Sequence, residues 1–280
     1  MRVWAKACLP VFGLCVWLCQ AVPVSAQTSD LVSRTAFRVC ADPANNPMSS
    51  EDGSGFENKL AELIAAKLEL PVQYVWFPQA TGFIRNTLAA KRCDVVIGYA
   101  QGHELVQNTN HYYTSAYALI VPMDSDLARV DMLNDPMLKG KRIGIVAGTP
   151  PAAHMARNGL IGQAKPYNLF VDRRVESPAI DMLDDLQSGE IDAAILAGPL
   201  GGPLVTADYP DFKVIPLVKE ERPPRLFYRS TMGVRKGEKV WQRQLNSLIR
   251  RNQDEINAVL AEAGVPLVND LGTEVLDLSQ

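Results

Sequence analysis

One local pattern occurs twice in this chain, and the two copies lie 98 positions apart. The first copy covers residues 88–97 and the second covers 186–195. In each copy a leucine precedes an aspartate by six residues, and an apolar strand follows the aspartate. This spacing is too long for one unit of a solenoid and favours two similar α/β lobes. The alternative is that any helix–turn–strand passage shows such a pattern.

Segments typical of buried strands alternate with segments of helical periodicity in both halves of the chain. The expected strands are 37–41, 72–77, 94–98, 117–121, 142–147, 169–171, 191–196, 214–215 and 232–234. One expected helix begins at Gly55 and stops at Pro71, and others cover 83–90 and 239–263. A further helix begins at Pro150, with Thr149 as its cap. Another carries Ile180, Leu183 and Leu186 on one face. The stretch 197–203 is expected to form a turn. This alternation predicts doubly wound parallel sheets.

The first 26 residues have the layout of a secretory signal peptide. Arg2 and Lys6 precede an apolar run over 7–19, and Val24 and Ala26 place short side chains before an expected cleavage near Ala26. A membrane anchor is the rival interpretation, but 13 residues are too few to cross ~30 Å of hydrocarbon. The sequence therefore predicts a mature protein in the periplasm.

Removal of residues 1–26 leaves two of the five cysteines, Cys40 and Cys93. An even pair in an exported protein predicts one disulfide, and two separate buried thiols are the alternative. Neither cysteine belongs to a Cys-x-x-Cys pair, so neither zinc binding nor redox catalysis is expected. The net charge of −3 gives no cationic surplus for nucleic acid.

Polar residues and glycines follow several of the expected strands. Because α/β lobes bind ligands at the carboxyl ends of their strands, we expect these residues to face one crevice between the lobes. The candidates are Asp42, Asn45, Asn46, Arg85, Tyr99, Gln101, Gly148, Thr149, Gly198 and Pro199. Two alternatives stay open: Arg85 is a surface arginine with a packed stem, and Asp42 caps its own loop through Asx-type bonds.

The sequence gives little support for catalysis. It contains no Gly-x-Ser-x-Gly elbow, no His-Glu-x-x-His pair and no Walker loop. We therefore expect a protein that is not an enzyme and that carries neither a cofactor nor a metal of its own.

The order of the motifs resembles the type II periplasmic solute-binding fold. The similar segments are 37–42, 55–57, 93–98, 112–113, 140–144, 148–149 and 233–237. The resemblance implies an α/β fold with two lobes, each a mostly parallel sheet flanked by helices. The implied divisions are a signal peptide over 1–26, lobe 1 over 36–121, lobe 2 over 122–230, a return to lobe 1 over 231–265 and a tail over 266–280.

Other stretches resemble a narrower group, the MxaJ/XoxJ accessory proteins of quinoprotein methanol dehydrogenases. These stretches are 39–47, 76–79, 82–88 and 249–253. The resemblance implies a protein that assists the maturation or activation of a dehydrogenase dependent on pyrroloquinoline quinone, by contact with that enzyme. The cytochrome c of the dehydrogenase is a further candidate partner.

Two departures from amino-acid receptors of this fold are informative. Those receptors hold the ligand carboxylate with an arginine soon after the strand that matches 94–98, and they hold the amine with an acid after a strand of lobe 2. Here 99–107 contains no arginine, and Ala197 stands at the place of the acid. The remaining alternative function is the substrate-binding component of an ABC transporter for a small solute that is not an amino acid. For the accessory role we expect an exposed apolar patch near Trp76 and Phe77 or over 199–203.

Overall fold

The structure is a computed structural model that describes Met1 and residues 31–277. The expected signal peptide lies outside the described residues apart from Met1. Within the part of the chain that is described, no helix has both the length and the apolar character needed to cross a membrane.

Seven α-helices are formed by the described residues. They are α1 (Phe56–Lys67), α2 (Phe83–Asn86), α3 (Pro150–Arg157), α4 (Pro178–Gln187), α5 (Gly198–Asp208), α6 (Lys239–Arg251) and α7 (Gln253–Glu262). The strands are β1 (Phe37–Ala41), β2 (Ala44–Asn45), β3 (Ser49–Ser50), β4 (Val72–Trp76), β5 (Val96–Ala100), β6 (Gln107–Pro122), β7 (Ile143–Val146), β8 (Lys165–Tyr167), β9 (Ala193–Ala197), β10 (Phe212–Pro216), β11 (Phe227–Val234) and β12 (Leu267–Val268).

The sheets are mixed rather than mostly parallel. The largest has the strand order β5-β11-β6-β9-β7-β8, with β10 and β12 also paired to β6. Pairing is parallel between β7 and its neighbours β8 and β9, and between β1 and β4. It is antiparallel wherever β6 takes part. The predicted parallel character fails at β6 and β11 because the chain passes between its two halves along one strand and returns along the other.

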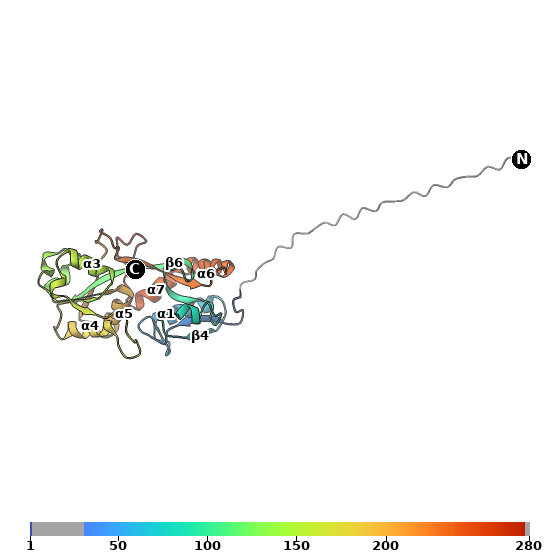
Figure 1. The fold of residues 1–280 in the computed structure, drawn as a ribbon, viewed down its shortest axis with the longest axis horizontal. Coiled ribbons are helices and arrows are strands. Elements are labelled where there is room, and N and C mark those ends of the chain that lie inside the picture. The colour runs from blue at the N-terminus through green and yellow to red at the C-terminus, as the bar shows by residue number, and fades with distance from the viewer. Residues whose placement is uncertain (2–30, 278–280) are drawn as a thin grey trace.

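The buried apolar residues form separate groups on the two sides of this passage. One group comes from 37–113 and 232–267, and the other comes from 117–226. We call the parts of the chain that carry them lobe 1 and lobe 2. Figure 1 shows β6 running between the elements around α1 and α6 and those around α3 and α4. The two-lobed α/β fold is thus confirmed, while the residue boundaries predicted for the lobes stay a prediction.

Several expected elements differ from those observed. The expected strand at 117–121 is the end of a 16-residue strand, β6, and the expected strand at 169–171 is absent because β8 ends at Tyr167. The expected helix at 83–90 stops at Asn86. The expected helix at 239–263 is interrupted at Asn252, whose side chain donates a hydrogen bond of 2.7 Å to the carbonyl of Leu248. This side chain competes with the main-chain ladder of the helix.

The expected turn at 197–203 is wrong, because Gly198 begins α5. Proline suits the first turn of a helix, where its missing N–H is not needed, and Pro199 occupies that position. The glycines have a role in packing: a Cβ at Gly201 would lie 2.7 Å from the side chain of Ile120. Glycine and proline therefore indicate close approach of this helix to its neighbours, which the local pattern could not distinguish from a turn.

The repeated pattern has the same structural role in both lobes. The main-chain N–H of Asp94 donates to the carbonyl of Arg38 at 2.8 Å, and that of Asp192 donates to the carbonyl of Arg142 at 2.8 Å. The side chains are also paired, because Arg38 contacts Asp94 at 2.7 Å and Arg142 contacts Asp192 at 3.5 Å. In each lobe an aspartate before one strand fastens that strand to an arginine on a neighbouring segment.

The predicted disulfide between Cys40 and Cys93 is confirmed, with a Cα–Cα distance of 5.5 Å. It links β1 to the segment that carries Asp94. The Asp94 carboxylate is buried and accepts hydrogen bonds from Arg38 at 2.8 and 2.7 Å, from Arg235 at 2.6 Å and from the N–H of Ser33 at 3.1 Å. Burial alone would raise the pKa of Asp94, but the bonds from the two arginines outweigh it and hold this pKa below 3.8.

We expect Asp94→Asn to lower the free energy of unfolding by about 3 kcal/mol at pH 7, because the carboxylate that pairs with both Arg38 and Arg235 is removed, while Arg235 keeps the carboxylate of Glu238 at 2.7 Å. The ionised carboxylate stabilises the fold above its unfolded pKa, and this contribution is lost as the pH falls through the lower folded pKa. The deficit of the variant should therefore shrink below about pH 4, as measured by urea unfolding across pH. The matched control is Asp192→Asn, whose partner is more exposed and which should lose only about 1 kcal/mol. Equal losses in the two variants would contradict the special role of Asp94.

Candidate functional site

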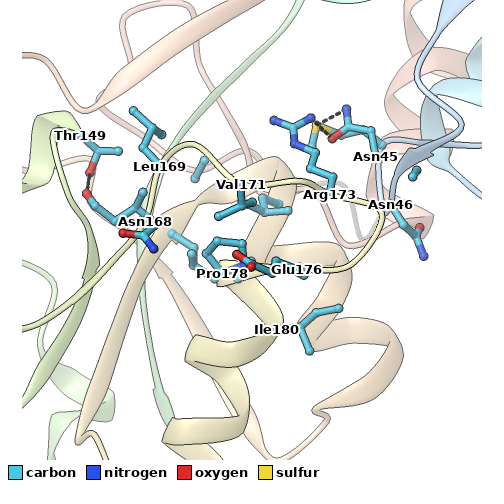
Figure 2. Close-up of a pocket in the computed structure, with 18 of the residues that line it drawn as sticks. Asn45, Asn46, Thr149, Asn168, Leu169, Val171, Arg173, Glu176, Pro178 and Ile180 are labelled. Carbon is cyan, nitrogen blue, oxygen red and sulfur yellow. Dashed lines mark hydrogen bonds between the residues drawn. The ribbon is translucent and has the colours of Figure 1, made fainter. Parts of the chain in front are cut away.

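A cavity of about 300 Å³ lies between the two lobes. The 44–48 loop of lobe 1 lines one side of it. Lobe 2 lines the other side with the carboxyl ends of β7 and β9, the start of α4, and the loop 168–177 (Figure 2). The cavity lies at the carboxyl ends of strands, where the sequence predicts a crevice between the lobes.

The inner lining of the cavity is apolar. Ile195 and Leu196 of β9 are almost fully buried, and Tyr117 and Val146 contribute from β6 and β7. These residues lie where both faces of the sheet are covered, so the strand ends carry apolar side chains up to the cavity. Ala197 presents only a methyl group there.

The loop 168–177, which has no regular secondary structure, reaches from lobe 2 to lobe 1 across the cavity. The guanidinium of Arg173 donates a hydrogen bond to Oδ1 of Asn45, as Figure 2 shows. The side-chain amide of Asn45 in turn donates to Oε1 of Gln79 at 3.1 Å. The loop forms a turn after Asp172, whose main-chain carbonyl accepts hydrogen bonds from the N–H groups of Val175 and Glu176 at 3.0 and 2.9 Å. The hydrogen bond from Arg173 to Asn45 joins the two lobes at the mouth of the cavity.

Asp42 lies behind the 44–48 loop and does not line the cavity. Its carboxylate accepts from the N–H of Ala44 at 2.9 Å and from that of Gln79 at 2.7 Å. Its carbonyl accepts from the hydroxyl of Ser49 at 2.8 Å. Asp42 therefore fixes the loop that presents Asn45, through one bond of the Asx type to Ala44 and one bond to the distant Gln79.

Of the other candidate residues, Asn45, Asn46 and Thr149 line the cavity. Thr149 stands at the N-cap position of α3 as expected, but its side chain makes no capping bond, because its hydroxyl donates to the carbonyl of Val146 at 2.7 Å. The rest are absent from its lining: Arg85, Tyr99, Gln101, Gly148, Gly198 and Pro199. Gly198 and Pro199 are buried at the start of α5, and Gln101 lies in a separate groove beside His111.

Three charged residues of this region were missed by the sequence patterns: Arg173, Glu176 and Glu57. The first two line the cavity in a loop that was expected to begin as a strand. Glu57 stands in the second position of α1, and its carboxyl lies against Gly98, where a Cβ would come within 1.8 Å of its Oε1. A larger residue at position 98 would therefore displace the carboxyl of Glu57.

The carboxyl of Glu57 has an unusual pKa. Burial raises this pKa from 4.5 to about 7, against the opposing effects of the N–H of Gly98 and the positive charge of Arg173. A carboxyl that titrates near neutral pH beside a cavity can accept or donate a hydrogen bond in response to its surroundings. No motif in the sequence indicates such a shift, because it depends on what covers the side chain.

Exposed apolar side chains stand in the loop 168–177 and at the start of α4. Leu169 and Ile180 are exposed and line the cavity. Phe170 is 92% exposed and Val175 78% exposed in the same loop, outside the cavity lining. This patch is not where we expected one. Pro199 and Pro203 are buried, and Trp76 is half-buried and stacked on Tyr74 with ring centroids 4.5 Å apart. Residues 199–203 are covered because they form a packed helix instead of an open turn.

The chain is similar to known proteins over most of its length. The model of the bacterial extracellular solute-binding proteins, family 3, matches residues 37–260. The crystal structure of periplasmic binding protein XoxJ from Methylobacterium extorquens AM1 is 39% identical, with a TM-score of 0.71 over 84% of this chain and 100% of that one. The crystal structure of MxaJ from Methlophaga aminisulfidivorans MPT is 25% identical, with a TM-score of 0.70 over 83% and 100%. Protein MoxJ of Methylorubrum extorquens is 28% identical over 88% of this chain and 89% of its own length.

We expect Glu57→Gln to stabilise the protein increasingly as the pH rises from 5 to 8. Because the folded pKa of Glu57 is raised, folding opposes ionisation of this carboxyl, and its contribution to stability falls between pH 4.5 and about 7. The glutamine variant should gain at most about 3 kcal/mol over the parent protein at pH 8 and little at pH 5. Thermal and urea unfolding measure this difference. Glu62→Gln, on the exposed side of the same helix, is the control, and a gain independent of pH would contradict the assignment.

Proposed function

This chain belongs to the bacterial extracellular solute-binding proteins, family 3, and to their MxaJ/XoxJ group, and from this premise we propose that it is a periplasmic accessory protein of a quinoprotein methanol dehydrogenase. It would assist the maturation or activation of that enzyme by direct contact. The described disulfide and the family's extracellular character support a location in the periplasm.

The observation that carries this proposal is the exposed apolar patch around an apolar cavity. Soluble monomers rarely leave several large apolar side chains in water within one short loop, as Leu169, Phe170 and Val175 are here, and such patches mark surfaces that bind other proteins. The patch belongs to the loop 168–177, which Arg173 holds in place through Asn45. A fixed apolar surface loses less conformational entropy on binding than a mobile one.

The chemistry of the cavity supports the same proposal. A free amino acid needs a countercharge for its carboxylate and another for its amine. At the sequence position of the amine anchor, Ala197 offers a methyl group, and Arg173 already bonds to Asn45. Arg173 and Glu176 are charged residues of the lining, but the inner wall of Ile195, Leu196 and Ala197 is apolar and favours an apolar group there, such as a side chain of a partner protein.

The direct test is co-purification from periplasmic extract, together with deletion of the gene. We expect the chain to retain the dehydrogenase, with its cytochrome c as a further candidate partner, and we expect the deletion to lower methanol oxidation by the enzyme. Normal dehydrogenase activity after deletion, with no retention of the enzyme, would overturn the proposal.

We expect the double variant Phe170→Ala/Val175→Ala to weaken association with the dehydrogenase roughly tenfold or more, because it removes two exposed apolar contacts. Both side chains are exposed, so the thermal unfolding temperature should stay close to that of the parent protein. Biolayer interferometry with the purified dehydrogenase measures the change. The control is Ile161→Ala, an exposed apolar residue outside the patch, and a similar loss in this control would show that the patch is not the contact surface.

A second candidate function is the substrate-binding component of an ABC transporter for a small solute other than an amino acid. The volume of the cavity favours it, since about 300 Å³ is enough for a small ligand. Thr149, Asn46 and Asn168 could orient such a ligand from the cavity wall. Native mass spectrometry of the protein isolated from periplasm tests this candidate. A retained small molecule that raises the unfolding temperature would support it, and an empty cavity in every preparation would exclude it.

A further inference from the structure

The segment that follows α7 lies across the junction of the two lobes. The helix ends at Glu262, and Gly264 takes a positive φ of +80°. Val265 and Leu267 are buried in the core of lobe 1. β12 then pairs with Ser115 and Thr114 of β6, where that strand leaves lobe 1 for lobe 2. The segment lies beyond residue 260, where the match to the family model ends.

Lobe 1 holds the segment through several polar contacts as well. The hydroxyl of Ser115 donates to the carbonyl of Pro266 at 2.6 Å. Nε2 of His111 contacts the carboxylate of Asp270 at 2.9 Å, and the guanidinium of Arg229 donates to the carbonyl of Asp270 at 2.7 Å. The chain then turns back, since the N–H of Leu276 donates to the carbonyl of Leu267 at 2.9 Å. The segment 264–276 is therefore a hairpin fixed to β6 and β11.

The same segment contacts lobe 2 through α5. Gly198, Gly202 and Thr206 stand at intervals of four residues along one face of this helix, which a helix brings onto one side. A Cβ at Gly202 would lie 2.2 Å from the carbonyl oxygen of Gly264 and 2.8 Å from the ring of Pro266. A Cβ at Gly198 would lie 2.7 Å from the same ring. The main chains of α5 and the hairpin thus touch without intervening side chains.

Such a contact restricts relative motion of the lobes. A change in the angle between them must bend β6 and β11 near Ser115, and it must move α5 against Gly264 and Pro266. A packed main-chain contact has no flexible side chain that could absorb such a shift, since protein interiors are close-packed.

We propose that the hairpin 264–276 is a strap that fixes the angle between the two lobes by clamping α5 of lobe 2 to β6 and β11 of lobe 1. The cleft is then held at one width instead of opening and closing. We infer this from the contacts of the strap alone, so it stands or falls independently of any dehydrogenase partner.

The test measures the distance between the lobes in the exported full-length protein by electron–electron double resonance. Spin labels are attached to Glu62→Cys on α1 and Gln187→Cys on α4, two exposed positions in different lobes. Cys40 and Cys93 are joined to each other and do not react. We expect one narrow distance distribution for the parent protein. Two populations, or a broad distribution, would overturn the proposal without any further variant.

Two variants then test the strap itself. Gly202→Ala places a methyl group against the carbonyl of Gly264, and Pro266→Ala removes the ring that lies against α5. Each should shift the distribution or roughly double its width, because the clamp is opened while β12 is kept. Alanine is also the better helix former, so loss of helix propensity cannot explain an effect of Gly202→Ala.

The control is Gly162→Ala, since a Cβ there meets nothing within 4 Å. Circular dichroism confirms that each variant is folded before its distances are read, and the milder Pro266→Ala variant decides the outcome if Gly202→Ala does not fold. A folded Pro266→Ala variant with the narrow distribution of the parent protein would refute the strap, as would an equal broadening in the control.

Discussion

The whole architecture depends on one strand, β6, whose main-chain N–H and C=O groups need hydrogen-bond partners in both lobes. β6 is 16 residues long, and buried N–H and C=O groups must find partners along all of it. β11 pairs with Gln107–Ala116, and β9 and β10 take over beyond that point. The strand is therefore held on both sides of the junction, and its direction fixes where each lobe lies.

At the start of β6 the outer edge is covered by side chains instead of a strand. The side-chain amide of Gln253 donates to the carbonyl of Tyr112 at 2.7 Å, and Oδ1 of Asn246 accepts from the N–H of Asn110 at 2.7 Å. Gln242 donates to the carbonyl of Asn108. These amides come from α6 and α7 and meet alternate residues of the strand. They replace the ladder of a neighbouring strand and close an edge that would otherwise invite another chain to pair with it.

The candidate site depends on this arrangement, since its residues come from loops that only the junction brings together. Asp42 fixes the 44–48 loop of lobe 1, and Asp172 fixes the loop of lobe 2 that carries Arg173. Arg173 then bonds to Asn45 across the cleft. The result is an apolar cavity whose surroundings hold the carboxyl of Glu57, with a pKa near neutrality. Rigid loops on a rigid junction favour a preformed surface over one that forms around its ligand.

The sequence by itself determined the features that depend on local periodicity and on the chemistry of single residues. It predicted β1, α1 and β4 closely, the disulfide between Cys40 and Cys93, and the equivalent aspartates of the two lobes, because a buried face or a paired cysteine leaves its mark within one segment. Only the tertiary structure decided that 198–208 is a packed helix, that the loop 168–177 brings Arg173 to Asn45, and that the carboxyl of Glu57 lies against Gly98. Those facts depend on the angle at which the two lobes meet. Contacts between residues more than 100 positions apart set this angle, so no single segment of the sequence can reveal it.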